Sequence, residues 1–186
     1  MAPYLNIPEK ETAVVDIQLQ KQYQRGLLKL NQLLIKYDIG EQLTYSEIKK
    51  LLYYDILFTS LMRNELMKED EDTRLLVYGL DLYRFDKDSF INQFKYTVVV
   101  FWERSGIVRK VEMFPSLESY LDFRKERVKE GFREVKVEIL PTLDHLIFIG
   151  RKIVEVGSKL GVLNILISRK PEFDPLGKDD EVVNHG

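Results

Sequence analysis

The chain has 186 residues, of which 28 are Lys or Arg and 30 are Asp or Glu, so its formal net charge is −2. It contains no cysteine and only 2 histidines. This composition excludes a disulfide framework, cysteine-ligated zinc, iron–sulfur clusters and thiol nucleophiles, and it leaves few residues for a histidine-based metal site. A near-neutral chain also lacks a global electrostatic attraction to nucleic acid. We therefore expect no cofactor and no metal.

Neither a signal peptide nor a membrane span is visible in the sequence. The N-terminus has no basic region followed by an apolar one, and no window approaches the roughly 20 apolar residues that a spanning helix needs. We expect a protein without membrane partners that lies in the cytoplasm, or in a virion if the protein is viral.

The first part of the chain predicts an extended arm and a long helix. Pro3 and Pro8 disfavour helix at the residues before them, so residues 1–11 are expected to form the arm. Thr12 is a candidate N-cap for a helix over residues 13–37. Apolar side chains recur in this helix at steps of three and four, on one face: Leu19, Tyr23, Leu27, Leu30, Leu34 and Tyr37. A stripe of this kind needs a mating surface, so these six residues are the predicted protein interface.

A second helix follows over residues 45–68. Thr44 and Glu47 have the spacing of a capping box, in which each residue satisfies a backbone N–H of the other. Residues 12–68 are thus expected to form a helical hairpin. The acidic run over residues 69–72 ends it as a solvated loop, and the domain boundary is placed at 68–73.

Residues 73–168 predict an α+β sandwich. Alternating apolar and polar residues favour strands, and Ser116 and Gly131 bound a helical pattern. The expected order is a strand over residues 75–85, a short helix ending near Lys95, a strand over 96–103, its hairpin partner over 107–114, a helix over 116–131 and a strand over 134–140. This β-α-β-β-α-β order is that of a ferredoxin-like sandwich.

The end of the chain leaves one choice open. Residues 142–160 fit either a β-hairpin or an amphipathic helix capped by Thr142, and the helical template fits more positions. In that helix Gly150 and Gly157 would allow close approach to a neighbouring element. A last strand is expected over Val162–Ser168, and residues 169–186 read as a polar tail. The predicted fold class is therefore α+β: a pair of long N-terminal helices, a ferredoxin-like sandwich and an extra C-terminal α-β.

Two patterns suggest nucleic-acid chemistry. Glu134 and Lys136 form an E-x-K motif of the kind that holds Mg²⁺ in nucleases, although alternating charges on the wet face of a strand give the same pattern. The second helix resembles a helix-turn-helix, in which Thr59, Ser60, Arg63 and Asn64 would contact nucleic acid. Residues 53–58 contain no breaker, however, so one continuous helix is the simpler interpretation.

RNA recognition is a further alternative, because an RNA-recognition domain shares the β-α-β-β-α-β order and stacks bases on strand aromatics. Tyr96, Phe101 and Trp102 are candidates, but the strand over 107–114 lacks the glycine-aromatic pattern. Residues 104–136 hold nine basic and six acidic residues, an excess of +3.

By elimination, we expect a non-enzymatic structural or adaptor subunit of a larger assembly, such as a virion, tail or connector component. Its partners would be other protein subunits, in a homo-oligomer or a hetero-assembly, contacted through the first helix and the terminal arms. The alternatives are a nucleic-acid-binding protein and a metal-dependent nuclease.

Overall fold

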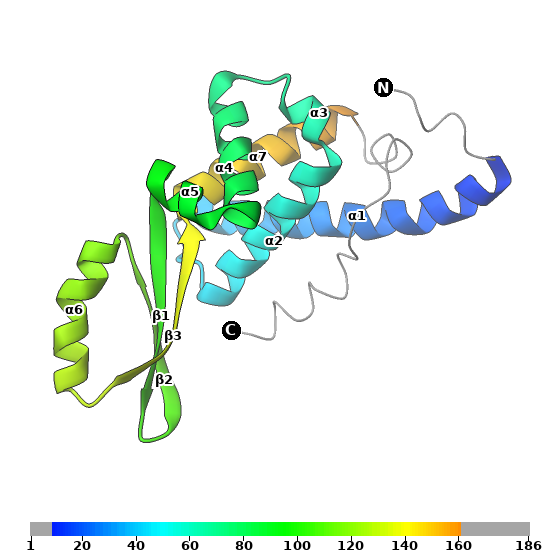
Figure 1. The fold of residues 1–186 in the computed structure, drawn as a ribbon. Helices are drawn as coiled ribbons and strands as arrows, with labels where there is room; N and C mark the ends of the chain where they lie inside the picture. Colours follow the sequence, from blue (N-terminus) through cyan, green and yellow to red (C-terminus); the bar gives the residue numbers. More distant parts are fainter. Residues whose placement is uncertain (1–8, 161–186) are drawn as a thin grey trace. The chain divides into compact units, whose positions relative to one another are not determined.

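The structure is a computed structural model that describes the backbone of residues 9–160. Side chains are described for residue 18 and for residues 21–159 apart from Arg109. The elements (Figure 1) are α1 (Glu9–Asp38), α2 (Tyr45–Leu61), α3 (Arg63–Leu66), α4 (Glu71–Phe85), α5 (Lys87–Gln93), β1 (Tyr96–Arg104), β2 (Ile107–Phe114), α6 (Leu117–Lys129), β3 (Arg133–Pro141) and α7 (Leu143–Leu160). The mixture of helix and sheet confirms the α+β class.

The chain forms two compact units. The first includes the described residues up to Tyr78 and those from Leu146 onwards, and the second comprises Gly79–His145. Both boundaries therefore fall inside helices, α4 and α7, whereas the sequence analysis places a boundary in the loop before α4.

The first unit is built from α1, α2, α3, the start of α4 and most of α7. Its buried side chains come from several helices and include Tyr23, Leu30, Leu34, Leu51, Tyr54, Phe58, Ile149 and Ile153. Glycines bring α7 close to α1. A Cβ on Gly150 would lie 3.1 Å from Cδ2 of Leu34, and one on Gly157 would lie 3.4 Å from Cδ2 of Leu27. The close approach predicted for these two glycines is confirmed.

Helix starts in this unit follow the predicted chemistry only in part. The capping box is confirmed: the Glu47 backbone N–H donates to Thr44 Oγ1 at 3.1 Å, and the Thr44 N–H donates to Glu47 Oε1 at 2.9 Å. Thr12, in contrast, is not an N-cap. It lies inside α1, which begins at Glu9, so residues 9–11 of the predicted arm are helical and residues 1–8 lie outside the described part.

The predicted helix over 45–68 is interrupted at Met62, which ends α2 and precedes the four-residue α3. The backbone N–H of Met62 still donates to the Phe58 carbonyl at 2.8 Å. The interruption is therefore a departure of the Met62 backbone from helical dihedral angles, and no loop separates α2 from α3.

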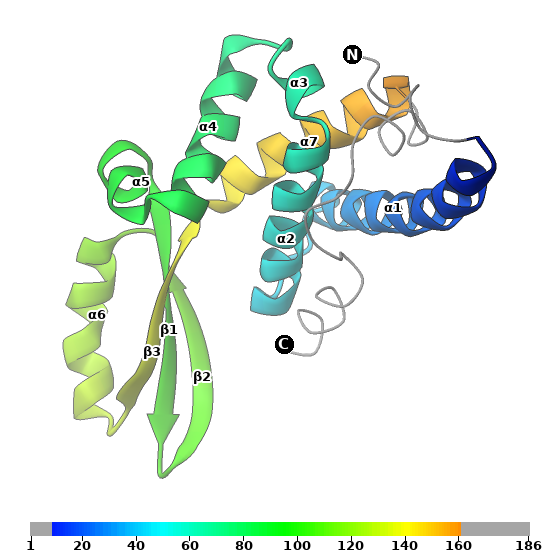
Figure 2. The ribbon, with the colours of Figure 1, turned by 45° about the vertical axis from the view of Figure 1, so that its right-hand side comes forward.

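The second unit contains a three-stranded antiparallel sheet in the order β2-β1-β3. Figure 2 shows α6 running along one face of this sheet. Val98, Val100 and Trp102 of β1 form a buried cluster there with Phe114 and Tyr120. The predicted hairpin of strands over 96–103 and 107–114, the helix over 116–131 and the strand over 134–140 are confirmed as β1, β2, α6 and β3.

The first predicted strand of this unit, over residues 75–85, is wrong. These residues form α4, whose buried side chains Thr73, Val77, Leu80 and Tyr83 recur at helical steps. The hydroxyl of Tyr83 donates to the Ile139 carbonyl of β3 at 2.8 Å. The ferredoxin-like arrangement is thus not confirmed, and the predicted last strand and polar tail lie outside the described residues.

The helical interpretation of residues 142–160 is confirmed by α7. Its start is the predicted one, because the His145 backbone N–H donates to Thr142 Oγ1 at 3.2 Å. This N-terminal turn belongs to the second unit, and the remainder of α7 belongs to the first.

Candidate functional site

The six residues of the predicted interface lie on the inward side of α1 wherever the structure describes them. Tyr23, Leu30 and Leu34 are buried, while Leu27 and Tyr37 are partly buried. The side chain of Leu19 lies outside the described set. The stripe therefore packs within its own unit, and the surface that α1 presents to solvent is a different one.

A second apolar stripe lies on the outward side of α1. Leu28 is 63% exposed, Ile35 is 51% exposed and Ile39, in the turn directly after the last helical residue Asp38, is 67% exposed. Steps of seven and four residues place these three side chains on one face of the helix. Single exposed apolar residues are ordinary on protein surfaces. Asn31 and Gln32 occupy the turn between Leu28 and Ile35, so the three apolar side chains recur on one helix face without forming an unbroken patch.

A groove of about 350 Å³ adjoins this stripe between α1 and α7. Its lining is Gln24, Leu27, Leu28, Asn31, Val154 and Ser158, and none of these residues is charged. Leucine and valine side chains can receive an apolar side chain, and the two amides can hydrogen-bond at its margin. We call the groove together with Leu28, Ile35 and Ile39 the α1 contact face.

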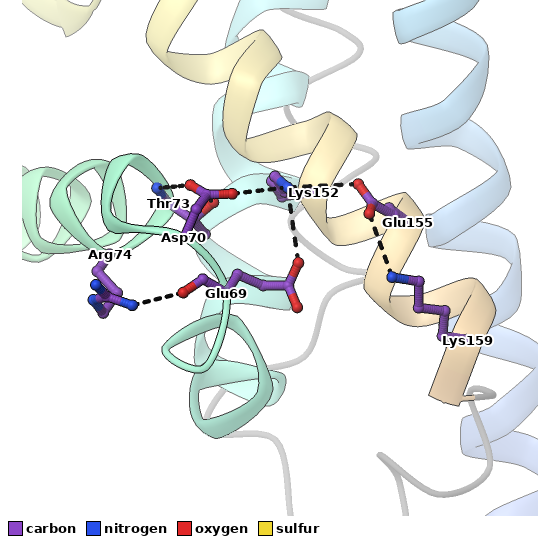
Figure 3. A network of polar contacts seen from close by, with 7 residues as sticks. All are labelled: Glu69, Asp70, Thr73, Arg74, Lys152, Glu155 and Lys159. Atoms are coloured by element: carbon purple, nitrogen blue, oxygen red, sulfur yellow. Dashed lines mark hydrogen bonds and ion pairs between the residues drawn. The ribbon is translucent and has the colours of Figure 1, made fainter.

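Polar contacts fix the α7 wall of the groove (Figure 3). Lys152 Nζ of α7 lies 3.0 Å from Asp70 Oδ2 and 3.7 Å from Glu69 Oε1, both in the segment before α4. Asp70 also accepts hydrogen bonds from the backbone N–H and the hydroxyl of Thr73. These hydrogen bonds, together with the nearby Lys152 ammonium group, lower the pKa of Asp70. The run predicted as a solvated acidic loop thus binds α7.

A second connection joins α7 to the end of α1. The Arg151 guanidinium pairs with Asp38, and its carbon lies 5.8 Å from the ring centroid of Tyr37. Both partners are about half exposed, so the pair contributes little energy by itself. The Arg151–Asp38 pair joins the start of α7 to the end of α1. The groove lies further along the same two helices.

The sequence analysis missed Asp55, the most unusual side chain of the first unit. It is fully buried, and neither carboxylate oxygen has a hydrogen-bond partner among the described groups. Its Oδ1 lies 3.3 Å from the position of a Cβ on Gly150. Burial without a partner raises the pKa of Asp55 well above its usual value. The sequence signal that could have indicated a buried carboxyl group is that Asp55 is the only charged residue in the apolar run over residues 51–58.

The residues predicted for DNA contact are not arranged as a reading surface. Thr59 is only 3% exposed. The Ser60 hydroxyl donates to the Ile56 carbonyl of its own helix at 3.0 Å. Arg63 and Asn64 follow in α3, which has four residues and is too short for a recognition helix.

The E-x-K motif is divided by a β-bulge. Lys136 pairs with Phe101 and Glu134 pairs with Trp102, and successive residues of β1 point to opposite faces of the sheet. Accordingly Glu134 pairs with Arg124 of α6, while Lys136 Nζ lies 5.4 Å from the Phe101 ring centroid. The two charged groups are thus on different faces, where they cannot share a metal ion.

Trp102 of the strand aromatics, and several basic residues of 104–136, already pack or pair within the second unit. Trp102 is buried beneath α6, on the face opposite Phe101. Arg127 holds Glu112 through two bonds of 2.6 Å and 2.9 Å. Further pairs join basic residues of 104–136 to acids: Arg133 with Glu103, and Lys136 with Glu138.

Among the described side chains, no three His, Asp or Glu residues are grouped closely enough to hold a metal ion. None of the described helices combines the length and the apolar character of a membrane span.

Comparison of the chain with protein-family models, with curated proteins and with solved structures finds no match.

Proposed function

We propose that the protein is a non-enzymatic structural or adaptor subunit that joins a larger assembly, and that α1 makes the principal contact with a second copy. The observation that carries this proposal is the row of Leu28, Ile35 and Ile39 beside an uncharged groove. The inward stripe of the same helix is already used by its own unit, so the outward stripe is available for a partner.

The amount of exposed apolar surface sets the strength of this contact. Burying the exposed part of one such aliphatic side chain contributes on the order of 1 kcal/mol. A symmetric pair of copies buries the α1 contact face twice. The sum is comparable with the cost of about 4–15 kcal/mol for bringing two molecules together. We therefore expect a concentration-dependent oligomer, in which further contacts add to the one made by α1.

The test is sedimentation velocity on the full chain at increasing concentration. The average mass of the natural protein is expected to rise, while the double variant Leu28→Glu/Ile35→Glu stays monomeric because its glutamates cannot be buried unpaired. The control is Gln18→Glu/Gln93→Glu, which adds the same charge at two exposed polar positions outside the α1 contact face. A natural protein that is monomeric at every concentration, or a double variant that assembles as well as the control, would contradict the proposal.

A further inference from the structure

Asp55 of α2 lies where α7 packs against α1. A Cβ on Gly150 of α7 would lie 3.3 Å from Asp55 Oδ1 and 3.3 Å from Leu30 Cδ1. A carbon atom placed there would thus touch both groups, and a water molecule needs a similar space. Water therefore cannot enter between α7 and the carboxyl group of Asp55 unless α7 moves away from α1.

No described group offsets a negative charge on Asp55. Its two carboxylate oxygens have no hydrogen-bond partner, and the hydroxyl of Thr59, one turn further along α2, is buried without donating to them. The α1 side chains that meet Gly150 beside Asp55, Leu30 and Leu34, are apolar. Burial is accordingly the cause of the raised pKa of Asp55, whereas a neighbouring cation would lower it.

The charged side chains of the helices around Asp55 are paired elsewhere. These pairs are Arg151 of α7 with Asp38, Lys152 of α7 with Asp70, and Lys36 of α1 with Glu47. Among the described residues of this unit, the other buried titratable side chains are Tyr23 and Tyr54. Tyrosine hydroxyls ionise only at high pH, so Asp55 is the buried group of this unit that can change its charge near neutral pH.

Ionisation of Asp55 opposes the contact between α7 and α1. In the closed arrangement the carboxyl group is buried and keeps its proton, while in an open arrangement water solvates it and its pKa returns towards about 3.9. The open arrangement thus releases a proton that the closed one keeps. Between about 3.9 and the raised pKa, each pH unit multiplies the ratio of open to closed molecules by up to about ten.

The same helix pair forms the groove of the α1 contact face. Val154 and Ser158 of α7 line this groove opposite side chains of α1, and Val154 follows Gly150 by one helical turn. Further along, a Cβ on Gly157 would lie 3.4 Å from Cδ2 of Leu27, which also lines the groove. Movement of α7 away from α1 at Gly150 would therefore separate the two walls of the groove.

We propose that Asp55 is a pH-sensitive switch for assembly, in which the α1 contact face is complete only while α7 lies against the protonated, uncharged carboxyl group. This inference rests on the proposed function, because it concerns the surface through which two copies join. Low pH favours the closed contact and assembly. Rising pH favours release of α7 from α1 and dissociation of the assembly.

Hydrogen exchange of the full chain at low concentration tests the switch without assembly. The protection factor, which is corrected for the pH dependence of amide exchange itself, is compared between pH 5 and pH 8. Protection of residues 146–160 in α7 is expected to fall by up to about tenfold for each pH unit until the raised pKa is reached. Protection of residues 45–61 in α2 should fall less, because α2 keeps its other contacts.

Two variants and a control isolate the carboxyl group. Asp55→Asn and Asp55→Leu cannot ionise, so the protection of α7 in either variant should be nearly the same at the two pH values. The leucine variant also covers the case in which the asparagine variant folds poorly. Asp122→Asn removes an exposed carboxyl group of α6, in the second unit, and should behave like the natural protein.

Sedimentation velocity of the same proteins at pH 5 and pH 8 measures the effect on assembly. The apparent dissociation constant of the natural protein is expected to be more than about tenfold higher at pH 8, because only molecules with the closed contact can associate. Asp122→Asn should show the same change, and the two Asp55 variants should show much less.

The two measurements together separate this inference from the proposed function. Loss of α7 protection and of assembly with rising pH, both abolished by the Asp55 variants, supports the switch. Equal losses of protection in α7 and α2, or a pH dependence that persists in both Asp55 variants, overturns it. Assembly that is independent of pH overturns the switch and leaves the proposed function intact. A natural protein that is monomeric at both pH values contradicts the proposed function and, with it, the control of assembly.

Discussion

Replacing Asp55 by leucine is expected to raise the free energy of unfolding by about 1–3 kcal/mol at neutral pH. The Asp55 carboxylate is fully buried and has no hydrogen-bond partner among the described groups. Leucine has the same branching and the same number of heavy atoms, so it fills the space beside Gly150 without a polar group to desolvate. Apolar replacements of similar shape are the ones that stabilise buried unpaired polar sites. Urea denaturation of the two proteins measures the difference.

The pH dependence of the stability difference between the natural protein and Asp55→Leu shows whether burial of the carboxyl group causes it. Burial raises the pKa of Asp55 in the folded state, so the folded protein keeps a proton that the unfolded chain releases above its ordinary pKa of about 3.9. The natural protein therefore loses stability as the pH rises from about 4 towards the raised pKa, by up to about 1.4 kcal/mol for each pH unit. The leucine variant lacks this loss, so its advantage should grow over the same interval.

Asp55→Asn separates charge from polarity. Its amide cannot ionise, so the variant should also lose this component of the pH dependence, but it retains a buried polar group and should gain less stability than the leucine variant. If both variants were less stable than the natural protein at neutral pH, Asp55 would have a compensating partner and this account of its surroundings would be wrong.

Leu30→Ala is expected to lower the free energy of unfolding by about 2–5 kcal/mol, whereas Leu28→Ala should change it by less than about 0.5 kcal/mol. The two leucines are only two residues apart on α1, but Leu30 is fully buried and Leu28 is largely exposed. Truncation of Leu30 leaves a cavity in the first unit, while truncation of Leu28 removes a side chain that the single chain does not pack.

The comparison must be made at low protein concentration, where self-association does not add to the stability of the natural protein. Thermal or urea unfolding followed by circular dichroism is sufficient. Equal losses for Leu28→Ala and Leu30→Ala would contradict the assignment of the two faces of α1, because they would place both leucines in the core.

Features that depend on local chemistry could be predicted from the sequence. The capping box of Thr44 and Glu47, the β1–β2 hairpin and the cap of Ser116 on α6 each depend on residues a few positions apart. The helical interpretation of residues 142–160 rested on a long amphipathic pattern, which sequence periodicity detects well.

The missed helix α4 shows where a short window misleads. Leu80 and Leu82 alternate with Asp81 and Tyr83, which suggests a strand, but the longer row from Thr73 through Val77 and Leu80 has helical steps. The window began too late to include the first turn, which Asp70 caps from a run that looked only like a solvated loop.

The candidate sites depended on information that one strand or helix does not carry. Periodicity showed that Leu30 and Leu34 share a face of α1, but it could not show whether α7 or another copy covers that face. For Glu134 and Lys136, the spacing of two residues implied a shared face, and the bulge that separates them depends on pairing with β1. Asp55 was overlooked because its burial follows from the packing of three helices.

The absence of cysteine allows a direct measurement of the surface that α1 uses. Ile35 is 51% exposed and its neighbour Leu34 only 4%, so single-cysteine variants at the two positions report on an exposed and a buried position of the same helical turn. The rate of reaction with a thiol reagent is followed at increasing protein concentration, with Lys68→Cys as an exposed control. Our account predicts that Ile35→Cys reacts rapidly when dilute and becomes protected as the concentration rises, that Leu34→Cys reacts slowly throughout, and that the control does not change. An Ile35→Cys rate that is the same at every concentration would contradict assembly through the α1 contact face.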